Sequence, residues 1–480
     1  MSGTMLALGG FAIMLGLIAI RAPIGLAMLL VGAAGYMQLS SANAFLSYIK
    51  TNTYHQFANY TLSVIPLFIL MGALAERAGI ARALFKAAEG LFGRFRGGLG
   101  MAVIGACTAF GAICGSSVAT TATFGRAALP ELDKYGYDKG FSTGTIAVGG
   151  TLGILIPPSV ILVVFAITTE QNIAKLFQAA LIPGLMAALF YCLTIAIVVR
   201  RHPHLAPLAK PVVVERAPQP LWTRLLAAGL AALVAAQWAR GGIGGGMALA
   251  GLGLAALVAL VEVAVMPAIL LALVVVGGIY GGVFTPTEGA AVGAVAMLLT
   301  GLGQRSLSFA DIVAALRQTA ETSGMIFIIL LGAEVFGAFL ALSRLPTIAA
   351  ETIGASGLSP YMVLIAMLAF YILLGAVMDE LAMILLTLPV FFPVIQGLDF
   401  GMPPDELAIW FGILVLTVVG IGLTAPPIGL NVFVISAIAR NVPITATYRG
   451  VLPFIVADII RLVLVLAMPG LALWLVRWLA

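Results

Sequence analysis

The sequence predicts an all-α polytopic membrane protein built from two inverted repeats. Of its 480 residues, 62% are hydrophobic and only 9% are charged, whereas a soluble domain carries about 25% charged residues. Apolar runs long enough to cross a bilayer as helices recur along the whole chain. The composition therefore predicts the membrane spans, and paired landmarks in the two halves predict the repeat.

Five landmarks recur in the same order, and the two members of each pair are separated by nearly the same length of chain. The pairs are Pro23 with Pro286, FILMGALAE with FIILLGAEVF, GAICGSS with GAVMDEL, Pro130 with Pro393, and ILIPPSVILVVF with LTAPPIGLNVFV. One match is weak in a chain this apolar, but five in register indicate an internal duplication. The repeats are predicted over residues 22–200 and 285–480.

Two segments lie outside these repeats. Residues 1–21 are predicted to form a retained N-terminal transmembrane helix, because the apolar stretch lacks the basic start and cleavage site of a signal peptide. Residues 201–284 are predicted to form a linker with extra transmembrane helices. In this linker a Pro-rich polar stretch at 202–222 precedes an apolar helix pair at 225–261.

The distribution of charge predicts that the two repeats have opposite orientations. Residues 76–96 are basic, whereas the matching stretch of the second half carries only Arg344 and Glu351. A second basic segment lies at 200–224, and the loop at 397–406 is acidic. Because basic loops stay on the cytoplasmic side, the first two segments are predicted inside and the third outside. The net charge of +5 therefore fits cytoplasmic loops, and nucleic acid is not expected as a partner.

Two long apolar segments are interrupted by paired prolines. Proline removes an amide donor and blocks the preceding helical turn, and freed carbonyls are costly in lipid. A bound cation would satisfy them, and the N-termini of half-helices favour anionic groups. Two simple proline kinks are the alternative. The segments are 138–168, broken at Pro157-Pro158, and 406–438, broken at Pro426-Pro427.

Two further apolar segments, 98–130 and 361–396, are broken near their middles by polar residues. Each is predicted to form a re-entrant hairpin that enters and leaves the membrane on one side, with an ordinary helix pair as the alternative. The first tip offers serine hydroxyls, which could instead bond to their own helix. The second tip carries Asp379, predicted to bind a cation or to stabilise the tip, and Glu380, expected to be structural.

The breaks and tips together predict one cation and solute site at mid-membrane. Carbonyl, hydroxyl and carboxylate oxygens are the ligands that a hard cation prefers. The residues predicted to bind the cation are Gly115, Ser116, Ser117, Thr151, Gly153, Pro157, Asp379, Thr424, Pro426 and Gly429. The residues predicted to contact the solute are Pro158, Ser159, Pro427 and Asn431.

Other charged residues in apolar segments are expected to be mainly structural. Glu76 and Glu334 are predicted to brace helix packing or to tune a proton. Asp458 and Arg461, at positions i and i+3, are predicted to pair with each other. The stretch 285–288 has the pattern of a helix start.

Four segments of mixed polarity are predicted to lie along the membrane interface or to brace the bundle. Connecting loops are the alternative. Residues 305–322 are among them, so they are expected to be separate from the apolar span at 323–342. The four segments are 41–60, 79–97, 305–322 and 343–358.

Enzyme chemistry is not expected from this sequence. No HExxH, GxGD or CxxC motif occurs, and all three histidines lie at or outside the ends of spans. The three cysteines, Cys107, Cys114 and Cys192, are scattered through apolar runs, so no disulfide framework is expected. A channel remains an alternative to a transporter, although it would not require paired broken helices.

At these residues the sequence resembles the large membrane subunit of the tripartite ATP-independent periplasmic (TRAP) transporters, the DctM-like permeases. The similarity extends over essentially the whole chain except residues 202–262. It is carried by GAICGSSVAT (111–120), YGYDKGF (135–141), GTLGILIPPS (150–159), GVFTPTEGAAVGA (282–294), GAVMDELAMILLTLPVFFPV (375–394) and WFGILVLTVVGIGLTAPPIGLNVFV (410–434).

The resemblance implies an importer of organic acids in the bacterial inner membrane, such as C4-dicarboxylates, sialic acid or other carboxylates. It implies Na⁺ as the coupling ion, with no other cofactor, and an elevator mechanism. Gly115 to Ser117 with residues 150–159 would form one Na⁺ site, and Asp379 with residues 424–431 another.

The resemblance also implies two partners, a small four-helix membrane subunit and a periplasmic substrate-binding protein. The sequence departs from the usual large subunit in the apolar insertion at 225–261, which could replace part of the small subunit's bracing role. A stand-alone Na⁺-coupled anion transporter is the nearest alternative. A channel or membrane scaffold is a further one.

Overall fold

The computed structural model describes residues 2–207, 232, 266–355 and 357–479, and all secondary structure in these residues is helical. The first half contains α1 (Gly3–Ala19), α2 (Ile24–Leu39), α3 (Ala42–Phe57), η1 (Tyr60–Ser63), α4 (Val64–Arg77), α5 (Ile80–Phe92), α6 (Gly98–Cys114), α7 (Ser117–Lys134), α8 (Lys139–Leu155), α9 (Val160–Thr168), α10 (Ile173–Arg201) and η2 (Pro203–Leu205). The second half contains α13 (Met266–Tyr280), α14 (Pro286–Gly303), α15 (Phe309–Ser343), α16 (Leu345–Ala355), α17 (Pro360–Gly375), α18 (Glu380–Gln396), α19 (Pro404–Gly422), α20 (Leu430–Ile438), α21 (Ile444–Ala467) and α22 (Gly470–Leu479).

Several of these helices are suited to a membrane. Within the described residues, five helices are long and apolar enough to cross a bilayer, and a sixth crossing is possible where α8 and α9 meet at a 43° bend. The five spans are Tyr60–Arg77, Ile173–Arg201, Phe309–Ser343, Pro404–Gly422 and Ile444–Ala467. These findings fit a polytopic membrane protein. The helix pair predicted at 225–261 lies outside the described residues, apart from position 232.

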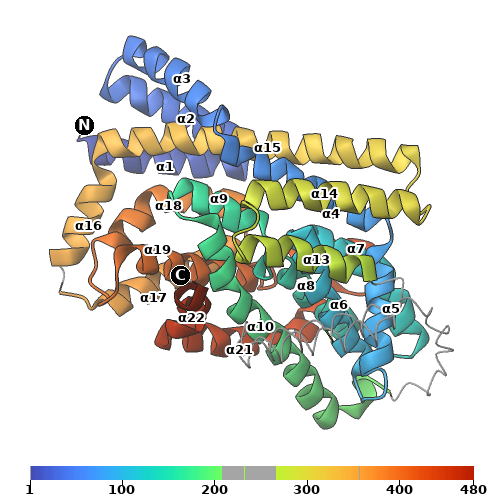
Figure 1. The fold of residues 1–480 in the computed structure, drawn as a ribbon. Coiled ribbons are helices and arrows are strands. Elements are labelled where there is room, and N and C mark those ends of the chain that lie inside the picture. Colours follow the sequence, from blue (N-terminus) through green and yellow to red (C-terminus); the bar gives the residue numbers. More distant parts are fainter. Residues whose placement is uncertain (1, 208–231, 233–265, 356, 480) are drawn as a thin grey trace.

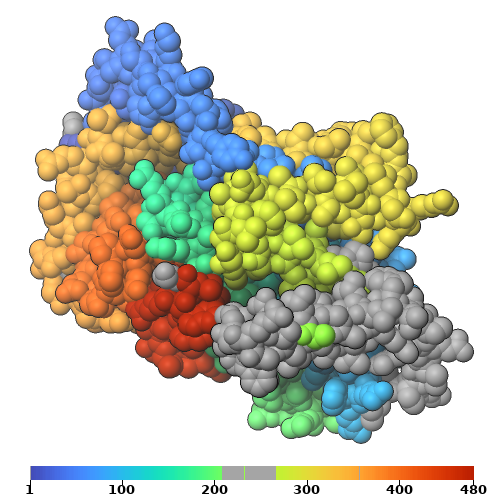
Figure 2. Space-filling model, in the orientation of Figure 1, coloured from blue at the N-terminus to red at the C-terminus, as the bar shows by residue number. Residues whose placement is uncertain are grey.

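The helices form two groups that pack against each other. Helix α15 runs along one side of the molecule with α1, α2 and α4 beside it, α14 packs on α4, and α3 stands at the outer edge of this group (Figures 1 and 2). The helices interrupted by polar or proline breaks, α6 to α9 and α17 to α20, lie on the other side of α4 and α15 together with α10 and α21 (Figure 1). The break at Pro157-Pro158 is therefore enclosed by helices, whereas Pro426 and Pro427 stay exposed.

The two halves contain the same succession of elements. In each half two arms separated by a polar break, α6–α7 or α17–α18, precede two half-helices, α8–α9 or α19–α20, and a long helix, α10 or α21. The packing is reciprocal as well. Helix α2 packs on α15 while α14 packs on α4, and α20 packs on α7 and α8 while α9 packs on α18 and α19.

The prediction of a separate interfacial segment at 305–322 is wrong. A single helix, α15, continues without a break from Phe309 to Ser343. Some of the polar residues near its start, such as Gln318 and Thr322, are partly buried against neighbouring helices, whereas others, such as Glu321, are exposed. Gln318, for example, accepts a hydrogen bond of 3.2 Å from Arg77 at the end of α4.

Local signals for helix ends and for one ion pair are confirmed. Thr285 and Glu288 form a capping box at the start of α14, with Pro286 in its first turn. Asp458 and Arg461 are paired at 2.8 Å, and both side chains are almost fully buried in α21. Removing either partner would leave an uncompensated charge inside the bundle.

Candidate functional site

The two polar breaks between hairpin arms have matching local structure. Gly115 ends α6 with a φ of +63°, a conformation that residues with a Cβ rarely adopt, and Ser116 then caps α7 by accepting a 3.4 Å bond from the Ala119 amide. In the second half Asp379 caps α18, accepting bonds from the amides of Leu381 at 3.2 Å and Ala382 at 3.4 Å. Ser116 and Asp379 thus hold equivalent capping positions.

Each hairpin tip contacts the proline break of its own half. A Cβ added to Gly115 would lie 2.9 Å from the Pro158 carbonyl oxygen, so this close approach requires glycine. In the second half the carbonyl of Ala376 accepts bonds from the amides of Ile428 at 3.2 Å and Gly429 at 3.3 Å. Both breaks are therefore held against backbone atoms of a tip.

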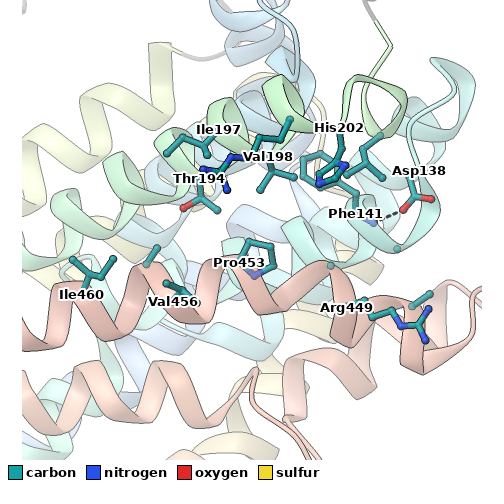
Figure 3. A pocket seen from close by; sticks show the side chains of 16 residues that line it. Asp138, Phe141, Thr194, Ile197, Val198, His202, Arg449, Pro453, Val456 and Ile460 are labelled. Carbon is teal, nitrogen blue, oxygen red and sulfur yellow. Dashed lines mark hydrogen bonds between the residues drawn. The ribbon is translucent and has the colours of Figure 1, made fainter.

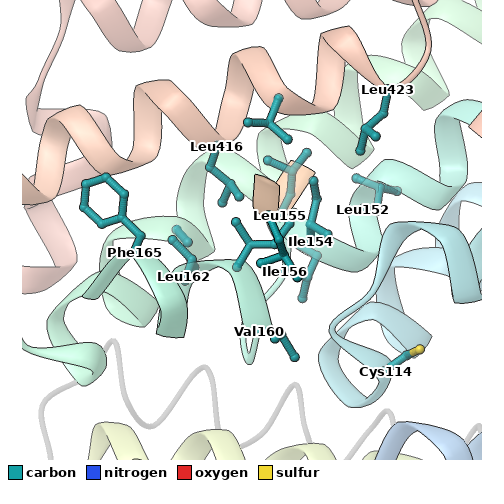
Figure 4. Close-up of a cluster of buried hydrophobic side chains, with 14 of the residues drawn as sticks. Cys114, Leu152, Ile154, Leu155, Ile156, Val160, Leu162, Phe165, Leu416 and Leu423 are labelled. Atoms are coloured by element: carbon teal, nitrogen blue, oxygen red, sulfur yellow. The ribbon is translucent and has the colours of Figure 1, made fainter. Parts of the chain in front are cut away.

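The two breaks differ in exposure. Pro157, Pro158 and Ser159 are buried, whereas Pro426 and Pro427 are exposed. An apolar cluster from α8, α9 and α19, with Cys114 of the first tip beside it, surrounds the first break (Figure 4). At the second break the Tyr448 hydroxyl lies 2.9 Å from the Pro427 carbonyl and 2.6 Å from the next carbonyl. Tyr448 therefore partly satisfies carbonyls freed by the proline pair, a role that the sequence did not indicate.

Asn431 joins the two halves at the first tip. Its amide nitrogen lies 2.7 Å from the Ser117 hydroxyl and 3.0 Å from the Ala147 carbonyl, and its amide oxygen lies 2.9 Å from the same hydroxyl. Asn431 and Ser117 are fully buried. Two residues predicted from opposite halves of the sequence are thus in direct contact.

The threonines predicted to bind a cation are engaged within their own helices. Thr151 donates to the Val148 carbonyl at 2.7 Å and lies 3.2 Å from the Tyr191 hydroxyl. Tyr191 in turn bonds both carboxylate oxygens of Asp458, at 2.8 and 2.9 Å. The Thr424 hydroxyl donates to the Ile421 carbonyl at 3.1 Å. Sequence reasoning missed Tyr191, whose apolar surroundings gave no signal.

A cavity of about 470 Å³ lies between the two tips. Of the predicted site residues, Gly115, Ser116 and Asp379 line it, and α4 and α15 form its opposite wall. The starts of four helices meet there. They contribute Ser116, Val118 and Ala119 from α7, Val160 and Ile161 from α9, Asp379, Glu380 and Leu381 from α18, and Leu430 from α20.

Three carboxylates line this cavity. Glu76 on α4 pairs with Arg126 at 2.6 Å, and Asp379 accepts the two amide bonds described above. Glu380 is only 6% exposed, and its Oε2 atom has no hydrogen-bond partner among the described residues. A purely structural Glu380, as expected from the sequence, would be expected to have a partner for this oxygen, and the described residues offer none.

A second cavity, of about 690 Å³, lies at the far end of α15. It is lined by polar residues of α3, including Asn52 and Gln56, and by residues that follow α9. Glu334 of α15 faces it and accepts a 3.4 Å bond from Asn52. Both cavities border the same stripe of α15, with Gln318, Thr322 and Ile326 at the first and Leu330, Glu334 and Gly337 at the second.

A third crevice, of about 740 Å³, runs between α10 and α21 and contains none of the predicted site residues. Apolar residues such as Ile197, Val456 and Ile460 lie toward one end, and Asp138, His202 and Arg449 toward the other (Figure 3). Asp138 is occupied as the cap of α8, because it accepts a 2.8 Å bond from the Phe141 amide.

Comparison with known proteins gives the same family as the motifs. Residues 11–471 match the model of the tripartite ATP-independent periplasmic transporter, DctM component. The chain belongs to the DctM family. The resemblance inferred from the motifs is therefore confirmed over nearly the whole chain.

Named relatives of this DctM family member are transporter permeases. The C4-dicarboxylate TRAP transporter large permease protein DctM of Pseudomonas aeruginosa is 34% identical over 88% of this chain and 87% of its own. The protein of the same name in Vibrio cholerae is 29% identical over 97% and 96% of the two chains. The sialic acid TRAP transporter large permease protein SiaM of Vibrio cholerae is 26% identical over 96% of each.

A solved structure supports the fold. The crystal structure of the Alcanivorax borkumensis YdaH transporter covers 90% of both chains with a TM-score of 0.57 and 16% identity. At this identity the likeness concerns the fold alone.

Proposed function

We propose that this chain is the large permease subunit of a Na⁺-coupled importer of organic acids in the bacterial inner membrane. The convergence of four helix N-termini, from α7, α9, α18 and α20, on one cavity carries the proposal. Each helix N-terminus carries a partial positive charge, so together they favour a carboxylate. The cavity volume of about 470 Å³ suits a small organic acid.

Na⁺ is assigned to two sites next to this cavity. The first comprises Gly115 to Ser117 with residues 150–159, and the second comprises Asp379 with residues 424–431. The contact of each tip with its proline break supports this pairing, because it brings carbonyl and side-chain oxygens together. Cations at these positions would offset the negative charge of the tips and of an entering carboxylate.

An elevator motion of the re-entrant hairpins and broken helices is proposed for transport. The two cavities that share one stripe of α15 support it, because their midpoints at Thr322 and Glu334 are about 18 Å apart along a helix rising 1.5 Å per residue. The first cavity lies beside the end of α4 that leads into the basic segment 76–96. By the positive-inside rule this end of α4 is cytoplasmic, so the first cavity is proposed to give access from the cytoplasm.

Two partner proteins are proposed, a small four-helix membrane subunit and a periplasmic binding protein that delivers the substrate. The family description as one component of a tripartite transporter supports them. The substrate class is an organic acid, consistent with relatives named for C4-dicarboxylates and sialic acid.

Reconstitution into proteoliposomes tests this function. Uptake of labelled carboxylates is measured for the chain alone and with a small subunit and binding protein from the same genome, with and without an imposed Na⁺ gradient. We expect saturable uptake that requires both the Na⁺ gradient and the binding protein. Transport of free substrate without a binding protein would favour the stand-alone transporter, and unsaturable flux indifferent to Na⁺ would favour a channel.

Variants at Asp379 separate cation binding from helix capping. Asp379→Ser keeps a capping oxygen, as Ser116 provides in the first half, but removes the charge. Asp379→Ala removes both. If the carboxylate binds Na⁺, both variants and Ser116→Ala will weaken the Na⁺ dependence of uptake while membrane insertion stays intact. If Asp379→Ser shows the same Na⁺ dependence of uptake as the wild type, the role of Asp379 is to cap α18 and not to bind Na⁺.

A further inference from the structure

One carboxylate at the central cavity has no ion-pair or hydrogen-bond partner among the described residues for its buried oxygen. Glu76 is paired with Arg126 at 2.6 Å, and Asp379 is held by amides of α18 and belongs to a proposed Na⁺ site. Among the described residues Glu380 has neither kind of partner, although it is only 6% exposed. An ionised carboxylate in such a place is costly unless a cationic group pairs with it.

No basic side chain in the described part of the chain supplies that group at the cavity. Of the described residues that line the cavity, none is Lys, Arg or His. The positive charge at this site comes instead from helix N-termini, which are well suited to one carboxylate. A dicarboxylate bound there would direct its second carboxylate into a wall that carries Asp379 and Glu380, and like charges at close range are unfavourable.

We propose that Glu380 pairs with a cationic nitrogen of the substrate, so that the transported acid is a zwitterion with one carboxylate and one ammonium or similar group. This inference rests on the proposed function and narrows its substrate class. The carboxylate of the substrate faces the helix starts, and its nitrogen faces Glu380. A cavity of about 470 Å³ has room for a molecule of this kind and is much larger than a single ion requires.

Binding to the full-length permease in nanodiscs, with Na⁺ present, tests this directly. The probes are matched pairs of similar length, such as succinate with 4-aminobutyrate and glutarate with 5-aminopentanoate, together with glycine betaine. We expect the wild-type chain to prefer the nitrogen-bearing member, and Glu380→Gln to lower its affinity about tenfold or more, because a charge-assisted hydrogen bond is lost. Affinity for the dicarboxylates should rise or stay the same in this variant.

The control is Glu321→Gln, which removes the same charge from the exposed side of α15, where Glu321 pairs with Arg317 and its side chain is 65% exposed. This variant should bind every probe like the wild type. Thermal unfolding of both variants without ligand shows whether they are folded.

The outcomes that overturn the inference are distinct from those that overturn the proposed function. Tighter binding of a dicarboxylate than of any zwitterion, failure of all zwitterions to bind, or unchanged probe affinities in Glu380→Gln would remove it. A variant that changes only the apparent affinity for Na⁺ would make Glu380 a cation ligand instead. In each of these cases Na⁺-dependent uptake can persist, whereas its absence for every carboxylate contradicts the proposed function itself.

Discussion

Asn431 and Ser117 show what the sequence can reveal about a single residue. Both were predicted as site residues because a polar side chain beside a helix break is unusual in an apolar segment. Their mutual contact could not be predicted, since it depends on how α20 packs on α7 and α8. Glu380 shows what the sequence cannot reveal about a single residue. Its type was visible in the sequence, but its burial and unpartnered oxygen are properties of the folded chain.

The contact of Asn431 leads to a prediction at this scale. Asn431→Ala leaves the buried Ser117 hydroxyl without its partner, which costs about 1–3 kcal/mol. We expect a lower unfolding temperature and reduced Na⁺-dependent uptake. Ser436→Ala is the control, because it removes a hydroxyl from the same helix that has no hydrogen-bond partner among the described residues. Equal unfolding temperatures and equal uptake in the two variants would contradict a bridging role for Asn431.

The elements were predicted best where a strong local signal interrupts a helix. The paired prolines place the breaks between α8 and α9 and between α19 and α20, as the structure does. Helix α15 was divided wrongly because polar residues such as Gln318 and Thr322 look like the end of a span. In the structure they face a cavity and the end of α4. Composition does not distinguish a residue that lines a cavity from one at the membrane surface, so the division needed the tertiary structure.

Close packing between the first tip and α8 gives a prediction at the scale of elements. A Cβ at Gly153 would overlap the Ser116 carbonyl and the Thr120 hydroxyl, whereas a Cβ at the equally buried Gly420 of α19 meets only ordinary contacts. Overpacking of this kind costs about 1–3 kcal/mol. We therefore expect Gly153→Ala to lower thermal stability and to impair uptake, and Gly420→Ala to change neither. Equal thermal stability and equal uptake in the two variants would contradict this prediction. The first tip would then tolerate displacement from α8.

Motion of one helix group against the other belongs to the scale of the whole molecule. The recurrence of elements and their reciprocal packing suit such a motion. Helices α4 and α15 of the first group form the contact with α6, α9 and α18 of the second group. Repeated motifs in the sequence predicted the division into halves. They did not predict which helices would form the wall along which a moving group travels, since that assignment depends on contacts between distant segments.

Two disulfides of similar geometry test this motion. A Cβ at Gly337 of α15 would lie 3.8 Å from Cβ of Pro389 in α18, and a Cβ at Gly149 of α8 would lie 3.6 Å from Cβ of Cys107 in α6. Both distances suit a disulfide, whose Cβ atoms are about 3.8 Å apart. The pair Gly337→Cys with Pro389→Cys joins α15 to a hairpin arm. The variant Gly149→Cys, paired with the native Cys107, joins two helices within the group proposed to move.

If the hairpins move against α15, oxidation of the first pair will abolish uptake in proteoliposomes and reduction will restore it. Oxidation of the second pair will leave uptake largely unchanged, because both cysteines travel together. Mass spectrometry of the oxidised samples verifies that each disulfide has formed. Full uptake with the α15–α18 disulfide in place would show that these helices stay together during transport. The cavities at the two ends of α15 would then have to exchange access by local opening of the tips.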